Sequence, residues 1–207
     1  MNELRILGKS CAFFLIFVLP VVALFAQTER TQVSPKPRTV LDDPDEYRVY
    51  EAVVRKYFGD ASNRILVLDR NVGGCGAAPV IPEAVGSKLS STQIEEINID
   101  CTTKKGNYEF NIIKFALKSK IELVSRQDLE KLFVPNCEDG WKKFYEKYPN
   151  SKGNVGFSRV GFDVTKKVDA LNFGYQSGCL AGQGKGIYLQ KTNDEWVIIG
   201  EWTMWIS

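Results

Sequence analysis

The spacing of apolar residues changes along the chain, from a helical period in the first part to alternation in the last part. Between Asp43 and Gly59, apolar side chains recur three and four residues apart, which is the spacing of one face of a helix. Asp43 can cap this helix, Pro44 suits its first turn, and Gly59 closes it after Phe58. The apolar face consists of Tyr47, Tyr50, Val53, Val54 and Tyr57. We therefore expect a helix from Pro44 to about Phe58 with one buried side.

Shorter elements are expected before residue 150. Ile65–Leu68 and residues 121–124 are short apolar runs and are predicted strands, whereas residues 71–82 are rich in glycine and proline and form a predicted loop. A second helix is predicted from Ser90 or Ser91 to about Cys101, because Ser90 with Gln93 three residues later fits a capping box.

Two further short helices precede the change of period. Ser125 caps the first of them, and Asp139 begins the second, which runs from Trp141 to Tyr148 and stops at Pro149. Both carry apolar residues on one face, so both are expected to pack against the rest of the domain.

From Asn154 onward, apolar and polar residues alternate, which is the period of strands with one buried face. Four strands are predicted, covering residues 155–162, 170–175, 186–190 and 196–205. Their connections, residues 163–167, 178–185 and 192–195, are short and polar or glycine-rich, so the strands form an antiparallel meander. Helices first and a meander last predict an α+β domain, with N-terminal helices packed on one face of a C-terminal antiparallel sheet.

The N-terminus has the pattern of an export signal. Arg5 and Lys9 precede an apolar run of 14 residues, Ala12–Phe25, and we expect cleavage after Ala26. The run is short for a membrane-spanning helix, which needs about 20 residues, although an uncleaved signal anchor is an alternative. A lipid anchor on Cys11 is disfavoured, because Cys11 comes before the apolar run. This predicts a signal peptide over 1–26, a flexible polar linker over 27–43 and a single domain over 44–207.

Four cysteines remain after the predicted cleavage, an even number that favours disulfides in an extracytoplasmic protein, periplasmic or secreted. Three full pairings are open, and we favour Cys75–Cys101 with Cys137–Cys179 because each closes a loop of moderate length. The chain has no Cys-x-x-Cys motif, so a thiol oxidoreductase or a cysteine-ligated zinc site is not expected.

Charge and composition exclude several function classes. Without Arg5, Lys9 and Glu3 the mature chain has 25 basic and 24 acidic residues, a net charge of +1, so no attraction to nucleic acid is expected. The chain contains no histidine, which excludes Ser-His-Asp and Cys-His nucleophiles and histidine-ligated metals. We expect no cofactor and no metal. Hydrolysis by two carboxylates needs no histidine and stays open.

Three features of the sequence are candidate binding elements. Gly182–Gly186 could suggest a phosphate-binding loop, but it leads into a strand and is interpreted as a hairpin connection. In a regular strand Trp196 and Trp202 share a face and Trp205 takes the other, so at least one large ring should lie on the outer face, where it could contact a ligand or partner. Arg159 is expected near a strand bend, in a rim ion pair with a carboxylate such as Asp163 or Asp169, or in contact with a ligand.

The stretch Trp141-Lys-Lys-Phe144-Tyr145-Glu-Lys-Tyr148-Pro149, followed by Ser158-Arg159-Val160-Gly161-Phe162, resembles an uncharacterised family of exported bacterial proteins. That family continues with an Ala-Leu strand, a turn rich in serine, cysteine and glycine, a strand with tyrosine and a final Trp-Ile-Ser. The corresponding segments are Ala170-Leu171, Ser177-Gly178-Cys179, Tyr188 and Trp205-Ile206-Ser207. The resemblance implies bacterial export and an α+β fold, and it supplies no catalytic residue.

The functional expectation is a non-enzymatic binding or interaction module whose partner is an unknown protein or small ligand, with no stable membrane span after signal cleavage. A hydrolase that uses carboxylates is the first alternative. The second is a small apolar ligand held in a cone-shaped pocket like that of the nuclear transport factor 2-like fold, which the order of helices before a curved meander permits by analogy. A pocket with two facing carboxylates would favour the enzyme, and a shallow sheet face or groove would favour the binder.

Overall fold

A computed structural model of the protein describes residues 38–75 and 83–207. The predicted signal peptide, and the predicted linker as far as residue 37, lie outside the described residues. Within them, β1 (Thr39–Val40) pairs in parallel with β4 (Tyr108–Glu109), and Leu41 is only 2 % exposed. Thr39 and Val40, which the sequence predicts to lie in the linker, therefore form a strand that pairs with the rest of the fold. A strand of two residues has no periodicity from which the sequence could predict it.

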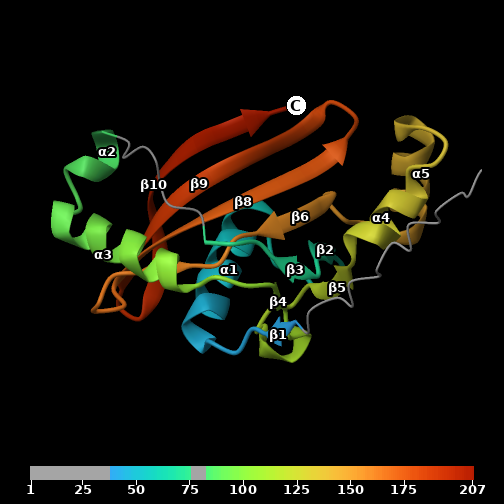
Figure 1. The fold of residues 1–207 in the computed structure, drawn as a ribbon. Coiled ribbons are helices and arrows are strands. Elements are labelled where there is room, and N and C mark those ends of the chain that lie inside the picture. The colour runs from blue at the N-terminus through green and yellow to red at the C-terminus, as the bar shows by residue number, and fades with distance from the viewer. Residues whose placement is uncertain (1–37, 76–82) are drawn as a thin grey trace, which may run out of the picture. The chain divides into compact units, whose positions relative to one another are not determined.

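Seven strands form the main sheet, in the order β10-β9-β8-β6-β2-β5 with β7 paired to β8 (Figure 1). The strands are β2 (Ile65–Asp69), β5 (Lys120–Val124), β6 (Asn154–Phe157), β7 (Gly161–Phe162), β8 (Val168–Gly178), β9 (Ala181–Thr192) and β10 (Glu195–Ile206). The pairs β6·β8, β8·β9 and β9·β10 are antiparallel, as the meander predicts. β2 lies parallel to both β5 and β6, which brings the N-terminal part of the chain into the same sheet. The α+β class is confirmed.

A smaller sheet of β1, β4 and β3 (Asn71–Val72) lies beside the main one, and the 3₁₀ helix η1 (Ile112–Lys114) follows it. Residues 71 and 72 are therefore in a strand, although the sequence predicts a loop over 71–82. Residues 76–82 of that loop lie outside the described part of the chain.

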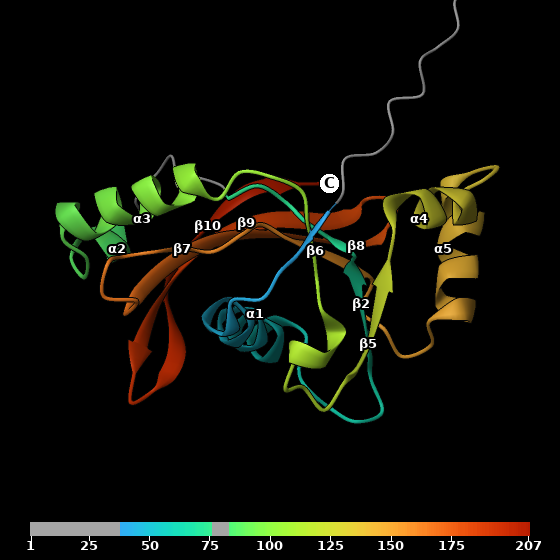
Figure 2. The same ribbon diagram turned by 60° about the horizontal axis from the view of Figure 1, so that its bottom comes forward.

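The helix α1 (Pro44–Tyr57) covers one face of the main sheet, as Figure 2 shows. Its predicted caps are present, because the Asp43 side chain accepts from Asp45 N and Gly59 has a φ of +76°. Tyr47, Tyr50 and the two valines that follow on the same side are at most 1 % exposed and lie in the largest apolar cluster. Complete burial of a side chain of this size contributes about 1.5–3 kcal/mol, so this face anchors the helix.

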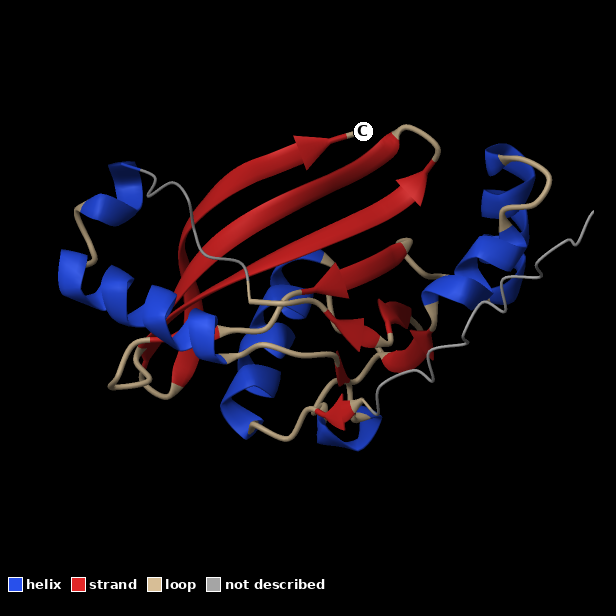
Figure 3. Cartoon of the chain, viewed as in Figure 1, coloured by secondary structure: helices blue, strands red, loops and turns tan. Residues whose placement is uncertain are grey.

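Further helices pack on the opposite face of the sheet, which we call the outer face (Figure 3). They are α2 (Glu83–Gly86), α3 (Ser91–Thr103), α4 (Arg126–Leu132) and α5 (Cys137–Lys147). The predicted capping box of α3 is present, with Gln93 N donating to Ser90 Oγ at 3.2 Å. Helices therefore cover both faces, and the expectation of one covered face is wrong. The sequence also predicts that α5 begins at Asp139, whereas the helix begins at Cys137 and Asn136 caps it.

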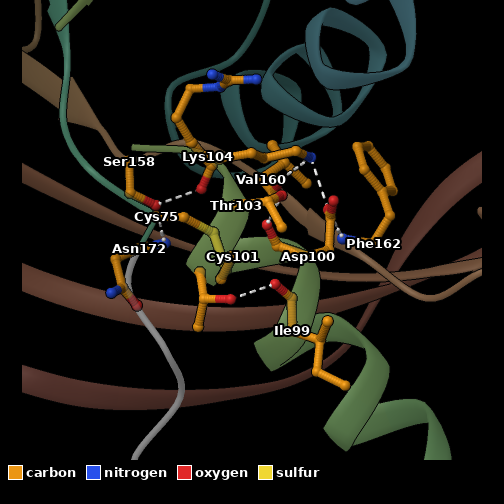
Figure 4. The surroundings of a disulfide bond; sticks show 12 residues. Cys75, Ile99, Asp100, Cys101, Thr103, Lys104, Ser158, Val160, Phe162 and Asn172 are labelled. Atoms are coloured by element: carbon orange, nitrogen blue, oxygen red, sulfur yellow. Dashed lines mark hydrogen bonds and ion pairs between the residues drawn. A yellow bond between two sulfur atoms is a disulfide. The ribbon is translucent and has the colours of Figure 1, made fainter. Parts of the chain in front are cut away.

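Both favoured disulfides are present. Cys75–Cys101, with Cα atoms 5.0 Å apart, joins the segment after β3 to α3, and Cys137–Cys179, 5.8 Å apart, joins α5 to the turn between β8 and β9. Figure 4 shows the first bridge beside Ser158 and Asn172 of the sheet. Each bridge ties an outer-face helix to a segment distant in the sequence.

Two predicted strand boundaries are also wrong. Residues 155–162 are not one strand, because β6 ends at Phe157 and the backbone then bonds elsewhere: Gly73 N donates to Phe157 O at 2.8 Å, and Val160 N donates to Glu46 at 3.2 Å. β9 begins at Ala181 rather than at residue 186, so the connection to β8 is only two residues long. The glycines 182–186 therefore belong to a strand.

Candidate functional site

Between its two helix-covered ends, the outer face of the sheet carries two open cavities, of about 490 Å³ and about 410 Å³. Asp69 and Arg126 line both, so the cavities adjoin. α2 and α3 pack over one end of this face, and α5 packs over the other. Figure 1 shows β8 and β9 between these two groups of helices. We call the combined surface the outer groove; it is centred on Asp69, Arg126, Gly156, Gly174, Met204 and Trp205.

A row of glycines forms the floor of the outer groove. Gly156 of β6 is the register partner of Gly174 of β8, and Gly174 is the partner of Gly184 of β9. A Cβ added at Gly156 would have only Asp69 Cβ within 4 Å, at 3.9 Å. The row crosses three strands and provides no side chains of its own, so the space above it is open at Gly156 and free to be filled by another side chain at Gly174 and Gly184.

Trp205 continues this row on β10, where it is the register partner of Gly184. Its indole lies directly over the sheet backbone: a Cβ at Gly184 would fall 2.0 Å from Trp205 Nε1, and one at Gly174 would fall 3.0 Å from Cζ2. The ring occupies the space that side chains would take at both positions. Trp205 is 41 % exposed, so one side of the indole is available at the end of the groove.

Two bulges in β10 decide which tryptophans share a face. Register shifts occur between Ile198 and Gly200 and again between Thr203 and Trp205. Each bulge adds one residue and reverses the alternation. Trp202 and Trp205 consequently lie on the outer face, opposite Gly186 and Gly184, and Trp196 faces α1. The predicted grouping of Trp196 with Trp202 is wrong, whereas an exposed outer ring is present at Trp205.

Trp202 is a packing residue. Its indole overlies Gly186, lies tilted against the Tyr188 ring with the ring centres 5.5 Å apart, and belongs to the apolar cluster that holds α2 and α3. Trp202 therefore helps to hold α2 and α3 on the outer face. It is not among the residues that line the groove.

Arg159 is buried rather than on a rim, and its partner is Glu46 of α1 instead of Asp163 or Asp169. Arg159 Nε lies 2.9 Å from Glu46 Oε2 and Arg159 Nη2 lies 2.5 Å from Oε1, while the guanidinium stacks 4.0 Å from the Tyr108 ring centre. Arg159 is 6 % and Glu46 0 % exposed. Burial lowers the pKa of Arg159 and the Glu46 hydrogen bond raises it, with a net rise. The expected rim pair is wrong, and this side chain is structural.

Lys104 completes the buried network around Glu46. Its Nζ lies 3.6 Å from Glu46 Oε1. It also lies 2.7 Å from Asp100 Oδ2 and donates to Val160 O at 2.6 Å, as Figure 4 shows. The network links α1, α3 and the break between β6 and β7, which explains why the strand ends where it does.

The polar side chains that line the outer groove include hydrogen-bond donors and hydrogen-bond acceptors. Four carry neutral amides: Asn71, Asn154, Asn172 and Gln176. The charged ones are Asp69, Arg126 and Glu130. Asp69 Oδ1 accepts from Asn71 N at 2.9 Å, and Arg126 Nε donates to Glu130 at 3.0 Å. The lining therefore has no surplus of positive charge and is mainly amide and aromatic in character.

The carboxyls near the sheet do not form an acid–base pair in the groove. Burial raises the pKa of Asp169 well above its usual range; Lys104 opposes this rise, and Asp163 and Glu46 add to it. Asp169 is 0 % exposed, so a substrate in the groove cannot reach it. Asp69 and Glu130, the carboxylates that do line the groove, each already hold a partner within the protein.

Sequence reasoning missed Asp69, Arg126 and the glycine row. The available signal was glycine at every second position from 182 to 186, which leaves one face of a strand bare, together with Trp202 and Trp205 as rings to cover it. When the same glycines are interpreted as a hairpin turn, the strand face that they leave without side chains is not predicted. Asp69 and Arg126 join the groove only through strand order, which no local pattern encodes.

Comparisons with protein-family models, with curated proteins and with solved structures found no significant match. Among the described residues, no group of three or more Asp, Glu or Cys side chains is placed to hold a metal ion. No helix in that part of the chain is long and apolar enough to cross a membrane.

Proposed function

We propose that the protein is a non-enzymatic binding module and that the outer groove holds its ligand. The observation that carries the proposal is the glycine row: Gly156 leaves open space on the outer face, and beside it the half-exposed Trp205 indole lies over Gly174 and Gly184. A sheet face that served packing alone would carry apolar side chains there, as the α1 face of the same strands does.

Export supports the same proposal. The two disulfides suit an oxidising compartment, and each braces a helix beside the groove. We propose that the mature protein works outside the cytoplasm, as the N-terminal pattern predicts, and that it belongs with the exported bacterial family which its C-terminal part resembles.

The alternatives are less well supported. The side of the sheet on which an enclosed apolar pocket would form is filled by α1, whose tyrosines pack against Phe110 and Phe157. A hydrolase would need two carboxylates placed as an acid–base pair across a cleft, whereas in the groove Glu130 is paired with Arg126 and Asp69 accepts from Asn71 N of its own turn.

A steric block tests the proposal. Gly156→Leu places a side chain in the groove floor, where the added Cβ would have room. Thr203→Leu is the matched control, because it puts leucine at an exposed position of β10 beside Lys185, on the opposite face from Trp205. Both variants and the wild type, purified from an exporting host, are screened by thermal shift against oligosaccharides, extended peptides and fatty acids.

The expected result is that one ligand class raises the Tm of the wild type and of Thr203→Leu but not that of Gly156→Leu. A class that stabilises all three proteins equally, or the absence of any stabilising class, would contradict groove binding. Mass spectrometry of the incubated ligands checks the other part of the proposal, since a cleaved product would favour the hydrolase.

A further inference from the structure

Resting on the proposed function, we infer that the ligand of the outer groove is an uncharged saccharide chain, laid across the strands from Trp205 towards Asp69. The inference concerns the chemical class of the ligand and is drawn from the side chains that line the groove, their charge balance and the length of the glycine row.

The amide lining is the first support. Asn71, Asn154, Asn172 and Gln176 come from the three strands β3, β6 and β8 and gather along the groove. An amide can donate and accept, and so can a hydroxyl, so amides are complementary to a ligand that carries many hydroxyls. The Oδ1 atoms of Asn154 and Asn172 are buried, so these two side chains can offer such a ligand only their Nδ2 donors. Asp69 and Arg126 add one acceptor group and one fork of donors, which suit pairs of neighbouring hydroxyls.

The exposed indole is the second support. Trp205 lies over the backbone of Gly184 and Gly174, so its free side faces outward as a flat apolar platform. The apolar C–H face of a sugar ring can stack on such a platform while its hydroxyls reach the surrounding polar groups. Tryptophan serves well where one side of a ligand is apolar and its edge is wet.

Other ligand classes fit less well. An extended peptide is usually captured at a sheet edge through unpaired backbone groups, but the floor strands β6, β8 and β9 already bond to neighbours on both sides. An anionic polymer would need a surplus of cations, yet Arg126 is accompanied by Asp69 and Glu130 in the lining. A lipid chain would leave the amides without hydrogen bonds.

The length of the row predicts a chain rather than a single sugar. Trp205, Gly184, Gly174, Gly156 and Asp69 stand on five neighbouring strands in the order β10-β9-β8-β6-β2. Neighbouring strands lie about 4.8 Å apart, so the row is about 19 Å long. A short oligosaccharide spans that distance, and a monosaccharide contacts only one end of it.

The test measures direct binding to defined sugars. An array of neutral and N-acetylated oligosaccharides identifies binders, and isothermal titration then compares the best tetrasaccharide with its monosaccharide on the wild type, Gly156→Leu, Trp205→Ala and Thr203→Leu. We expect the monosaccharide to bind at least tenfold more weakly than the tetrasaccharide. Gly156→Leu and Trp205→Ala should each weaken tetrasaccharide binding at least tenfold, and Thr203→Leu should leave it unchanged. Circular dichroism confirms that the variants are folded.

The outcomes separate this inference from the proposed function. If no oligosaccharide binds, but a peptide or fatty acid binds in a manner that Gly156→Leu abolishes, the groove is the binding site and the saccharide inference is wrong. If nothing tested binds in a manner sensitive to Gly156→Leu, both are wrong. Oligosaccharide binding that Gly156→Leu and Trp205→Ala leave intact also overturns the inference, because the sugar then binds elsewhere.

Discussion

Replacement of Arg159 by methionine should destabilise the protein by about 3 kcal/mol. Glu46 is 0 % exposed and receives its closest charged contacts from Arg159, at 2.9 Å and 2.5 Å. Removing one member of a buried ion pair typically costs about 3–5 kcal/mol, because the other charge is left without compensation. We take the low end, because Lys104 Nζ stays 3.6 Å from Glu46 and Tyr50 OH still donates to it at 2.9 Å.

Urea unfolding followed by far-ultraviolet circular dichroism measures this change directly. For a domain of this size each kcal/mol lowers the Tm by about 2–4 °C, so a fall of about 6–12 °C is expected in a thermal scan. The matched control is Lys120→Met, which removes the exposed partner of Glu122 and should change stability by about 0–1 kcal/mol.

The double variant Glu46→Gln with Arg159→Met discriminates between charge and packing. If the loss in Arg159→Met comes from a buried unpaired carboxylate, neutralising Glu46 should recover part of it, so the double variant should be more stable than Arg159→Met alone. A loss below about 1 kcal/mol for Arg159→Met, or losses that simply add in the double variant, would refute the assignment of this pair as a structural anchor of α1.

Three further outcomes are expected. Burial raises the pKa of Asp169, so the folded protein keeps a proton that the unfolded chain releases above about pH 3.9. The stability that this proton contributes is complete below that pH and is lost as the pH rises. Asp169→Asn should therefore flatten the fall in unfolding free energy that urea unfolding measures from about pH 4 to 7. An unchanged slope would count against it. The double variant Cys137→Ser with Cys179→Ser should lose about 4 kcal/mol in the same assay, since the bridge closes 42 residues, and a loss under about 1 kcal/mol would show that the bridge adds little. Ser90→Ala should cost about 1 kcal/mol of unfolding free energy through its cap on Gln93 N, and no loss would mean that the cap is replaced by water.

Helix ends and disulfides were predictable because their determinants are local or few. The caps of α1 and α3 depend on Asp43, Ser90 and Gln93, each within one turn of the helix that it stabilises, and the structure contains both. The cysteine pairing had three alternatives, and preferring loops of moderate length identified the right one. The meander was likewise readable, because alternation over adjacent segments predicts antiparallel neighbours.

The candidate site was only partly predictable. Trp205 was selected on the assumption of a regular strand, and it is exposed, but two bulges place it on the same face as Trp202. Arg159 was expected on a rim and is instead buried against Glu46, a residue 113 positions away. Neither a bulge nor a partner at that separation leaves a local mark in the sequence.

By itself the sequence determined the α+β class, the caps of α1 and α3 and the absence of histidine chemistry, because each depends on residue types or on spacings within a few residues. The export signal stays a prediction of the same local kind. The tertiary structure decided the rest. Parallel pairing of β2 with β5 and β6 brings Asp69 beside Gly156, and register across β6, β8 and β9 aligns three glycines from distant segments into one floor. Strand order and register arise from the packing of the whole domain, so the groove exists only in the folded chain.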